Sequence, residues 1–427
     1  MPSTLNFRQA LGKPSTARDE LIMTDLGMLF VLFLAVFFAM DPFILYIDKR
    51  TIFKHLHLMF AVPVFVMAWI GVRISAGRRL FTPVSYICWP LMVLAIWIIA
   101  GSLYARFHDN LIETFLTMGL YMLVTLGAAR FIADHRNPTI LLNTYLGLLL
   151  GAIFVGALWQ AGILQVWSKF HEVEAFTVPL AVFLFVRAES TQGRIWSVVF
   201  MFLLMMLVIK NTSFIVAAIT LAYIWWVFVR PRLALQQVLS RLLHYYSLAL
   251  AGLAVAGVYA GINLLDTSAL PDGNTKFRFY TYERTWDGFI HSPIWGKSFT
   301  GAGAEMFSLF HVDASTQILP SHSDLLDILG EGGLIGMTVF LYGLWRVARY
   351  VRARFVSRSL GTLSPTLEAH FHWLTVSCLS TIPVVAFNPI LLQPGKAFLI
   401  WMNLGILIGL AIRCAESGQT ATDKKSQ

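Results

Sequence analysis

Charged residues are scarce in this sequence of 427 residues. Asp, Glu, Lys and Arg make up 13% of the chain, and 57% of the residues are hydrophobic, whereas a soluble domain is about 25% charged. A chain with so little charge cannot cover its apolar surface in water, which excludes a soluble globular protein. The expected solvent for the remaining apolar surface is a lipid bilayer.

Cysteine is also scarce, with Cys88, Cys378 and Cys414 as its three occurrences. No pair of them has the spacing of a metal site, and a disulfide framework is not expected. The net charge of +9 is not accompanied by a run of basic and aromatic residues that would indicate a nucleic-acid surface. The sequence therefore predicts no metal, no cofactor and no nucleic-acid partner.

Apolar runs long enough to cross a bilayer recur along the whole chain. Backbone polar groups must be paired inside lipid, so these runs are predicted to be helices. Twelve are expected, near residues 24–47, 56–75, 83–104, 111–132, 139–164, 174–187, 195–210, 213–229, 245–263, 325–348, 371–388 and 396–413. The predicted fold class is an all-α polytopic membrane protein with about twelve transmembrane helices.

The distribution of Lys and Arg predicts how these helices are oriented. With the N-terminus inside, 21 of the 32 basic residues fall in segments that face the cytoplasm. The resulting organisation is a cytoplasmic segment at 1–23, transmembrane helices 1–9 in 24–263, a large outer loop at 264–324, helices 10–12 in 325–413 and a cytoplasmic tail at 414–427.

The outer loop is much longer than the other connections. Connections of this length are usually functional or disordered, and the many Trp and Phe residues of this one argue against disorder. We expect the loop to fold against the outer membrane surface, partly as a helix. Its best helical segment is 280–291, which Pro293 and Gly296 would end.

The polar segment 321–324 precedes the apolar run that starts at Leu325. A hydroxyl residue followed three positions later by an acid is typical of a helix start, which places His322 in the first turn at the outer aqueous phase. The positive end of a helix favours a neutral imidazole, which accepts a proton from a hydroxyl group. The alternative is an interfacial histidine with no role in chemistry.

Glu331 follows nine residues later, about two and a half turns into the same helix. A carboxylate at that depth usually faces a bundle interior or a water cavity. Gly330, Gly332, Gly333 and Gly336 surround it and would let another backbone approach closely. The favoured interpretation of Glu331 is a structural hydrogen-bond anchor to a neighbouring helix.

Arg278 and Arg284 are the candidate anion-binding residues of the outer loop. An arginine fork matches phosphate oxygens, and a helical spacing of six, close to two turns, predicts one shared face. The alternative is a solvated surface helix held by Glu283 and Asp287.

Lys210-Asn211-Thr212-Ser213 interrupts the apolar stretch between the seventh and eighth spans, at the predicted outer surface. A lysine at a membrane boundary is most often a snorkelling anchor, and a phosphate contact is the sharper alternative. Two other outer groups, one of which includes Glu174, are interpreted as ordinary loops, with the lining of a cavity as the alternative.

The segment 322–336 resembles the histidine, the acid-glycine pair and the glycine that open a late transmembrane helix in the superfamily of bacterial O-antigen ligases and Wzy-type O-antigen and exopolysaccharide polymerases. Arg278, Tyr282, Pro293 and Gly296 resemble the family's arginine, its following aromatic residue, and the proline and glycine that close the next helix. The twelve predicted spans and the large outer loop agree with this resemblance.

The sequence departs from the family at one place. Where the family commonly has serine-arginine-glycine at the outer end of a middle helix, this chain has Lys210-Asn211-Thr212-Ser213-Phe214. Lys210 would supply the positive charge there as a point charge rather than as a bidentate fork.

The resemblance implies a GT-C-like, metal-independent, inverting glycosyltransferase of the bacterial inner membrane, with both termini cytoplasmic and the active site facing the periplasm. The donor would be an oligosaccharide on undecaprenyl diphosphate. Its diphosphate would contact Arg278, Arg284 and Lys210, while His322 and Arg278 would be catalytic. Structural or supporting roles fall to Glu331, Asp324 and Glu283.

The favoured function is the polymerisation of exopolysaccharide or O-antigen repeat units. The alternative is a ligase whose acceptor is lipid A–core, and a lower-ranked one is a transporter of lipid-linked glycans, which would show internal repeats and paired midplane charges. The expected partners are the lipid-linked donor, an acceptor glycan, membrane lipids, and a chain-length regulator with other polysaccharide export proteins.

Overall fold

The computed structural model describes ten stretches of the chain. They are residues 83–109, 113–135, 137–163, 174–208, 211–229, 274–300, 323–356, 363–388, 390–391 and 394–425. The predicted spans near 24–47, 56–75 and 245–263 lie outside these stretches, as do Lys210 and His322.

Every regular element in the described stretches is a helix. They are α3 (Pro83–Asp109), α4 (Glu113–Asp134), α5 (Pro138–Gln160), α6 (Glu174–Thr177), α7 (Leu180–Arg187), α8 (Thr191–Val208), α9 (Asn211–Ile224), the π-helix η4 (Trp225–Val229), α11 (Asn274–His291), α12 (Asp324–Val356), α13 (Pro365–Phe387) and α14 (Pro394–Lys425). Among them are seven helices long and apolar enough to cross a membrane. The all-helical, multi-pass fold class is confirmed, and the total of twelve spans stays a prediction.

The predicted sixth span, 174–187, is not a single crossing helix. It consists of α6, with four residues, and α7, with eight residues. At 1.5 Å per residue α7 rises about 12 Å, far less than the roughly 30 Å of a hydrocarbon core. Pro179, which has no amide hydrogen to continue a helix, lies at the break between them.

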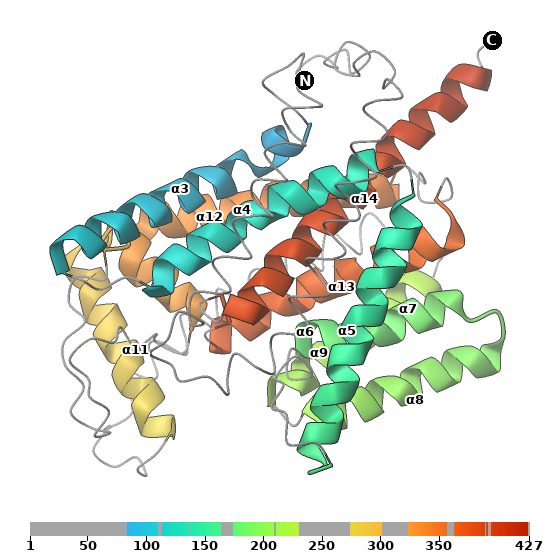
Figure 1. Ribbon diagram of the computed structural model, residues 1–427, viewed down its shortest axis with the longest axis horizontal. Coiled ribbons are helices and arrows are strands. Elements are labelled where there is room, and N and C mark those ends of the chain that lie inside the picture. Colours follow the sequence, from blue (N-terminus) through green and yellow to red (C-terminus); the bar gives the residue numbers. More distant parts are fainter. Residues whose placement is uncertain are drawn as a thin grey trace.

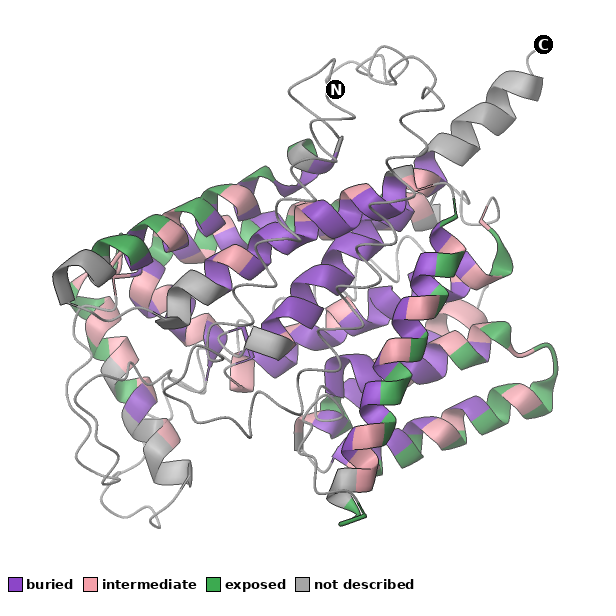
Figure 2. Cartoon of the chain, viewed as in Figure 1, coloured by how far each residue is buried: buried purple, intermediate pink, exposed green. Residues whose placement is uncertain are grey.

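The bundle is built around α14. Figure 1 shows α14 between α4 and α13, and α3 covers the other side of α4, while α12 packs against α3. The membrane-length part of α14 is 94% buried, compared with 28% for α8. Figure 2 shows the same division, with buried residues concentrated on α4, α13 and α14. The apolar outer surface of α8 is therefore available to lipid.

Glycine allows α14 to cross α4 closely. A Cβ added to Gly405 would lie 2.5 Å from the Thr125 carbonyl oxygen, and one added to Gly409 would lie 2.6 Å from the Ala129 carbonyl oxygen. Such small-residue contacts let transmembrane helices approach until their backbones touch. The Thr125 hydroxyl adds a hydrogen bond of 3.0 Å to the Trp401 carbonyl.

Arginine side chains tie the helices together at one end of the bundle. Pro90 inside α3 leaves the Tyr86 carbonyl without its helical amide partner, and Arg346 of α12 donates to that carbonyl at 2.6 Å. Arg413 of α14 donates to three carbonyls at the end of α4, those of Ile132, Ala133 and His135. Arg346 and Arg413, two of the basic residues that predicted a cytoplasmic side, thus lie at the end of the bundle opposite the start of α12.

Candidate functional site

Arg278 lies on α11, the helix predicted within the outer loop. The predicted end at His291 is confirmed, and the helix begins earlier than expected, at Asn274. Thr281 is buried, and Thr285 packs so closely on Gly330 of α12 that a Cβ there would lie 2.7 Å from its methyl carbon. Residues three, four and seven apart share a helix face, so half-buried Arg278 lies on the face of α11 that meets α12.

The Tyr282 phenol of α11 lies close enough to Arg278 of α11 and Asp327 of α12 to interact electrostatically with both. Burial raises the pKa of Tyr282, the Arg278 guanidinium acts against this rise, and the Asp327 carboxylate adds to it. The phenol is therefore a neutral hydroxyl at physiological pH. Asp327 is buried and was not among the predicted site residues, although a carboxylate inside an apolar run was a signal for it.

The prediction that Arg278 and Arg284 share a helix face is wrong. Six residues at 3.6 residues per turn bring Arg284 to about 120° from Arg278 around α11. The side-chain position of Arg284 lies outside the described residues, and that of Glu283 is exposed. Arg278 is thus the arginine that α11 directs toward α12.

The start of α12 is confirmed to within one residue, and its cap is Ser323 rather than Ser321. The Ser323 hydroxyl accepts a hydrogen bond of 3.3 Å from the Leu326 amide, and the helix begins at Asp324. His322, which lies outside the described residues, immediately precedes this cap in the sequence.

Asp324 joins the start of α12 to the connection between α13 and α14. Its carboxylate accepts hydrogen bonds from the amides of Ile390 at 2.7 Å and Leu391 at 2.8 Å, and the side chain is 1% exposed. Two backbone donors and the positive end of α12 stabilise a buried carboxylate. Asp324 therefore fixes the start of α12, two residues after His322 in the sequence, to the 390–391 connection.

Helix α12 is interrupted inside its glycine-rich segment. Gly333 has φ 59° and ψ −162°, which is not helical. The turn that follows α11, residues 293–299, fills the interruption and pairs with the freed backbone groups. These hydrogen bonds run from Lys297 N to Gly330 O (3.2 Å), from Phe299 N to Glu331 O (3.2 Å), from Leu334 N to Pro293 O (2.8 Å) and from Ile335 N to Ile294 O (3.2 Å).

Close backbone approach at the glycines was predicted, and the structure confirms it. A Cβ added to Gly296 or to Gly333 would lie 2.5 Å from a carbonyl carbon of the opposite segment, that of Glu331 or of Ile294. Both glycines also have positive φ angles. The backbone that approaches belongs to the 293–299 turn rather than to another transmembrane helix, and the Glu331 carbonyl is one of its anchors.

Helix α3 holds the 293–299 turn from the other side. The buried Phe299 ring meets Trp97 edge-on at a centroid distance of 5.3 Å, and Trp295 meets the same indole at 6.1 Å. Ser298 and Phe299 adopt φ angles of 54° and 60°, which non-glycine residues rarely do unless surrounding contacts impose them. The turn thus joins α11, with Arg278, rigidly to α12.

The segment that contains Lys210 is tied to α6. Lys210 lies outside the described residues, but Thr212, in the first turn of α9, donates a hydrogen bond to the Glu174 carboxylate. Glu174 is 0% exposed. The interpretation of Glu174 as an ordinary loop residue is therefore wrong, because it is the buried first residue of α6.

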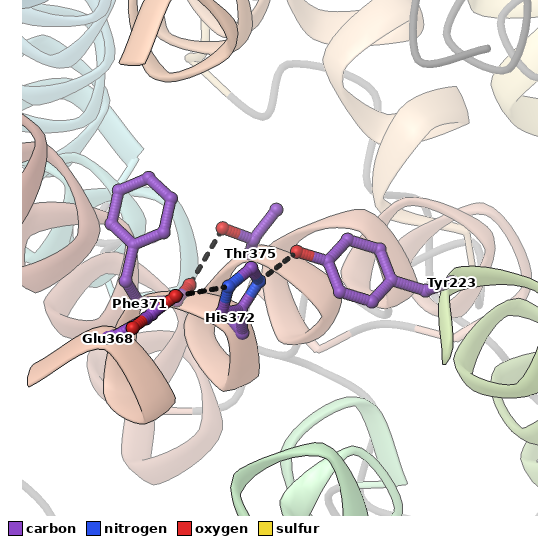
Figure 3. A network of polar contacts seen from close by, with 5 residues as sticks. All are labelled: Tyr223, Glu368, Phe371, His372 and Thr375. Atoms are coloured by element: carbon purple, nitrogen blue, oxygen red, sulfur yellow. Dashed lines mark hydrogen bonds and ion pairs between the residues drawn. The ribbon is translucent and has the colours of Figure 1, made fainter. Parts of the chain in front are cut away.

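A second polar network lies in the first half of α13 (Figure 3). The Tyr223 hydroxyl lies 2.7 Å from His372 Nδ1, and His372 Nε2 lies 3.7 Å from the Glu368 carboxylate. His372 is about 24 Å along α13 from Asn388, at 1.5 Å per residue. This network therefore joins α9 to α13 far from Arg278 and Asp324, and the sequence analysis had missed it.

Comparison with known families assigns the central part of the chain. Residues 196–341 match a family model described as O-antigen ligase. This segment of the chain is therefore similar to the O-antigen ligase family. The match runs from α8 through the interruption in α12 and includes both stretches that carried the resemblance, which is thereby confirmed. A search of curated proteins returned no match.

The matched segment covers about a third of the chain and contains α11, the 293–299 turn and the first part of α12, up to residue 341. Glu174 lies before this segment, and the 390–391 connection that Asp324 holds lies after it. Contacts from both flanking parts therefore complete the surroundings of the segment's polar residues.

Proposed function

We propose that this protein is an inner-membrane glycosyltransferase that polymerises O-antigen or exopolysaccharide repeat units on the periplasmic face. The donor is an oligosaccharide on undecaprenyl diphosphate, and the acceptor is a second lipid-linked repeat unit. The match of residues 196–341 to the O-antigen ligase family supports a lipid-linked glycan as substrate. The observation that carries the proposal is the packing of α11 and the 293–299 turn against α12. This packing brings the Arg278 face of α11 against the start of α12, and His322 immediately precedes the cap of that helix in the sequence.

The proposed reaction is a single displacement at the anomeric carbon of the donor sugar. The acceptor hydroxyl oxygen forms the new glycosidic bond, and His322 accepts the hydroxyl proton. The bond between the sugar and the diphosphate breaks, and its electron pair leaves with the diphosphate. The Arg278 fork stabilises this developing charge from a half-buried position, where a charge-assisted hydrogen bond is stronger than in water.

A ligase that uses lipid A–core as acceptor remains the second candidate, because it shares the donor and the family. The lysine in place of the family's middle arginine favours the polymerase. A transporter would need its interrupted helices to line a substrate path. In the described part of α12, the 293–299 turn occupies the interruption and pairs with its backbone groups, which disfavours a transporter.

The proposed orientation places both termini in the cytoplasm and the start of α12 at the periplasm. It is supported by the arginines at the opposite end of the bundle, which include Arg187, Arg346, Arg349 and Arg413.

Gel profiling of the surface and lipid-linked glycans of a deletion strain tests this function. We expect chains longer than one repeat unit to disappear, because a polymerase makes the bond between repeats. Long chains that accumulate on the lipid carrier without reaching lipid A–core would instead establish the ligase, and an unchanged profile would exclude both.

Arg278→Lys is expected to lower the transfer rate by about 100-fold although the positive charge is retained. Lysine cannot make the two parallel hydrogen bonds of the fork, and loss of one transition-state donor costs about that much. The measurement is initial transfer rate in isolated membranes with a lipid-linked donor.

Arg284→Lys is the matched control for this substitution. It makes the same change on the same helix, about 120° away around α11, and we expect a smaller loss. A larger loss for Arg284→Lys than for Arg278→Lys would move the diphosphate site to the other face of α11.

A further inference from the structure

An open groove lies between α7 and α8. It has a volume of about 420 Å³, and its lining includes Leu184 and Ala188 at the end of α7 and Gly193, Trp196, Ser197 and Leu203 of α8. The α8 residues recur every three or four positions or at multiples of them, so they share one helix face. Trp196 and Leu203 are exposed, so the groove opens on the surface of α8 that is available to lipid.

Small residues make room for this groove. Ala188 and Gly193 carry no side chain beyond Cβ, and the Ser197 hydroxyl turns back to donate a hydrogen bond of 2.9 Å to the Gly193 carbonyl. Leucine, tryptophan and phenylalanine side chains form most of the remaining lining. Because the hydrogen-bonding capacity of the serine is already used, the groove favours hydrocarbon over water.

The length of the groove matches one leaflet of a bilayer. From Gly193 to Leu203 helix α8 rises about 15 Å at 1.5 Å per residue, which is half of the roughly 30 Å of a hydrocarbon core. A transmembrane helix of a partner protein would need a groove of about twice this length. The dimensions therefore fit an acyl chain of a single leaflet.

Arg194 lies at the polar end of the groove and is held there by α7 and its end. Its Nε donates a hydrogen bond of 3.4 Å to the carbonyl of Ala188, and its guanidinium lies over the Phe185 ring at 5.6 Å from the centroid. Within the described stretches, the two terminal nitrogens of Arg194 have no hydrogen-bond acceptor. The side chain is exposed, so these nitrogens can donate to the phosphate of a lipid headgroup.

The charge at this end of the groove favours an anionic headgroup. Arg187 and Arg194 are exposed, and neither forms an ion pair with a carboxylate in the part of the chain that the structure describes. Glu189 is the acidic residue between them, so residues 187–194 carry a net charge of +1. Basic residues close to a membrane surface attract anionic lipids, whereas a zwitterionic headgroup brings a cation of its own.

We propose that this groove is a binding site for an anionic phospholipid, with one acyl chain between α7 and α8 and the phosphate on Arg194. Figure 1 shows the connection between α7 and α8 on the side of the bundle away from α11. In the proposed orientation, the lipid belongs to the cytoplasmic leaflet. The site is therefore separate from the donor diphosphate, which is proposed to bind Arg278, and it does not depend on the proposed reaction.

Quenching of Trp196 fluorescence by brominated lipids tests the site, because bromine quenches an indole that it contacts and Trp196 lines the groove. The full-length protein is purified into phosphatidylcholine nanodiscs that contain increasing fractions of a brominated lipid. The signal of the groove is the difference between the wild type and Trp196→Phe. We expect brominated phosphatidylglycerol to reach half of its quenching at a mole fraction about fivefold lower than brominated phosphatidylcholine, which is the preference that one basic residue provides.

Arg194→Gln is expected to remove the preference for phosphatidylglycerol, and Arg194→Lys is expected to keep most of it, because the positive charge is retained. Arg349→Gln is the matched control. Arg349 is also exposed and its guanidinium also lies over an aromatic ring, that of Trp345 at 5.3 Å, but it belongs to α12. The preference of Arg349→Gln should equal that of the wild type.

Ser197→Leu tests the acyl chain, because it places a larger side chain on the buried floor of the groove. We expect both lipids to need a mole fraction about tenfold higher, as the loss of burial of about two methylene groups predicts. Val199→Phe makes the same test from the rim of the groove if Ser197→Leu does not fold. Ile195→Phe, at an exposed position of α8 outside the lining, is the control and should leave quenching unchanged.

Three results would overturn the proposal. The first is equal quenching of the wild type by the two lipids, or equal losses for Arg194→Gln and Arg349→Gln. The second is an absence of quenching specific to Trp196, which would show that a second copy of the chain covers the groove. The third is displacement of phosphatidylglycerol by undecaprenyl diphosphate at a lower mole fraction, which would assign the groove to the polyprenyl tail. Because the assay does not require glycan transfer, failure of the proposed function leaves this proposal standing.

Discussion

His322→Ala is expected to abolish detectable glycan transfer while the protein still accumulates in the membrane. Loss of a positioned proton acceptor lowers a rate by about 100- to 10,000-fold. The fold should survive, because the cap of α12 is the Ser323 hydroxyl and the start of the helix is held by Asp324. The measurement is transfer rate in membranes normalised to the amount of protein.

His291→Ala is the matched control for His322→Ala. His291 ends α11, is exposed and contacts the Asp287 carbonyl through Nδ1 at 2.7 Å, so it lies in the same outer loop without facing α12. We expect nearly normal transfer from it. Normal polymer from His322→Ala would remove His322 from the mechanism and leave charge stabilisation by Arg278 as the main contribution.

Gly333→Ala is expected to uncouple α11 from α12, with a loss of stability of about 2–6 kcal/mol and of most transfer activity. The new methyl group would lie 2.5 Å from the Ile294 carbonyl carbon, which belongs to the rigid backbone of the 293–299 turn. Gly333 also has φ 59° and ψ −162°, a conformation that is essentially restricted to glycine and costs an alanine about 1–3 kcal/mol. Overpacking of this kind adds about 1–3 kcal/mol.

A graded set of glycine substitutions tests the packing of the 293–299 turn into the interruption of α12. Gly332→Ala meets the tip of the Phe299 side chain at 2.8 Å, a ring that can move, so its effect should be smaller. Gly147→Ala and Gly151→Ala in α5 meet nothing within 4 Å and should be neutral. Thermal unfolding in detergent and transfer rate are both measured. Equal effects of Gly333→Ala and Gly147→Ala would show that the packing of the 293–299 turn into α12 contributes nothing to stability or to transfer.

Features that depend on neighbouring residues in the sequence could be predicted from it. The length of apolar runs determined the membrane-spanning helices that the structure describes, because lipid leaves a helix as the way to pair every backbone group. The end of α11 before Pro293 and the start of α12 at Asp324 followed from local chemistry as well. So did the close approach at Gly333, since only a small residue admits another backbone.

Features that join distant parts of the chain were decided by the tertiary structure. The sequence did not show that the 293–299 turn would occupy the interruption in α12, that Asp324 would bind the 390–391 connection, or that Glu174 would be buried against Thr212. Local patterns specify which residues need a partner, whereas the choice of partner depends on packing between segments far apart in the sequence. The sequence alone thus determined a multi-pass helical protein with a glycine-rich segment shortly after His322. The fold decided which distant segments hold α11, Asp324 and Glu174 in place, through contacts across 30 to more than 60 residues of chain.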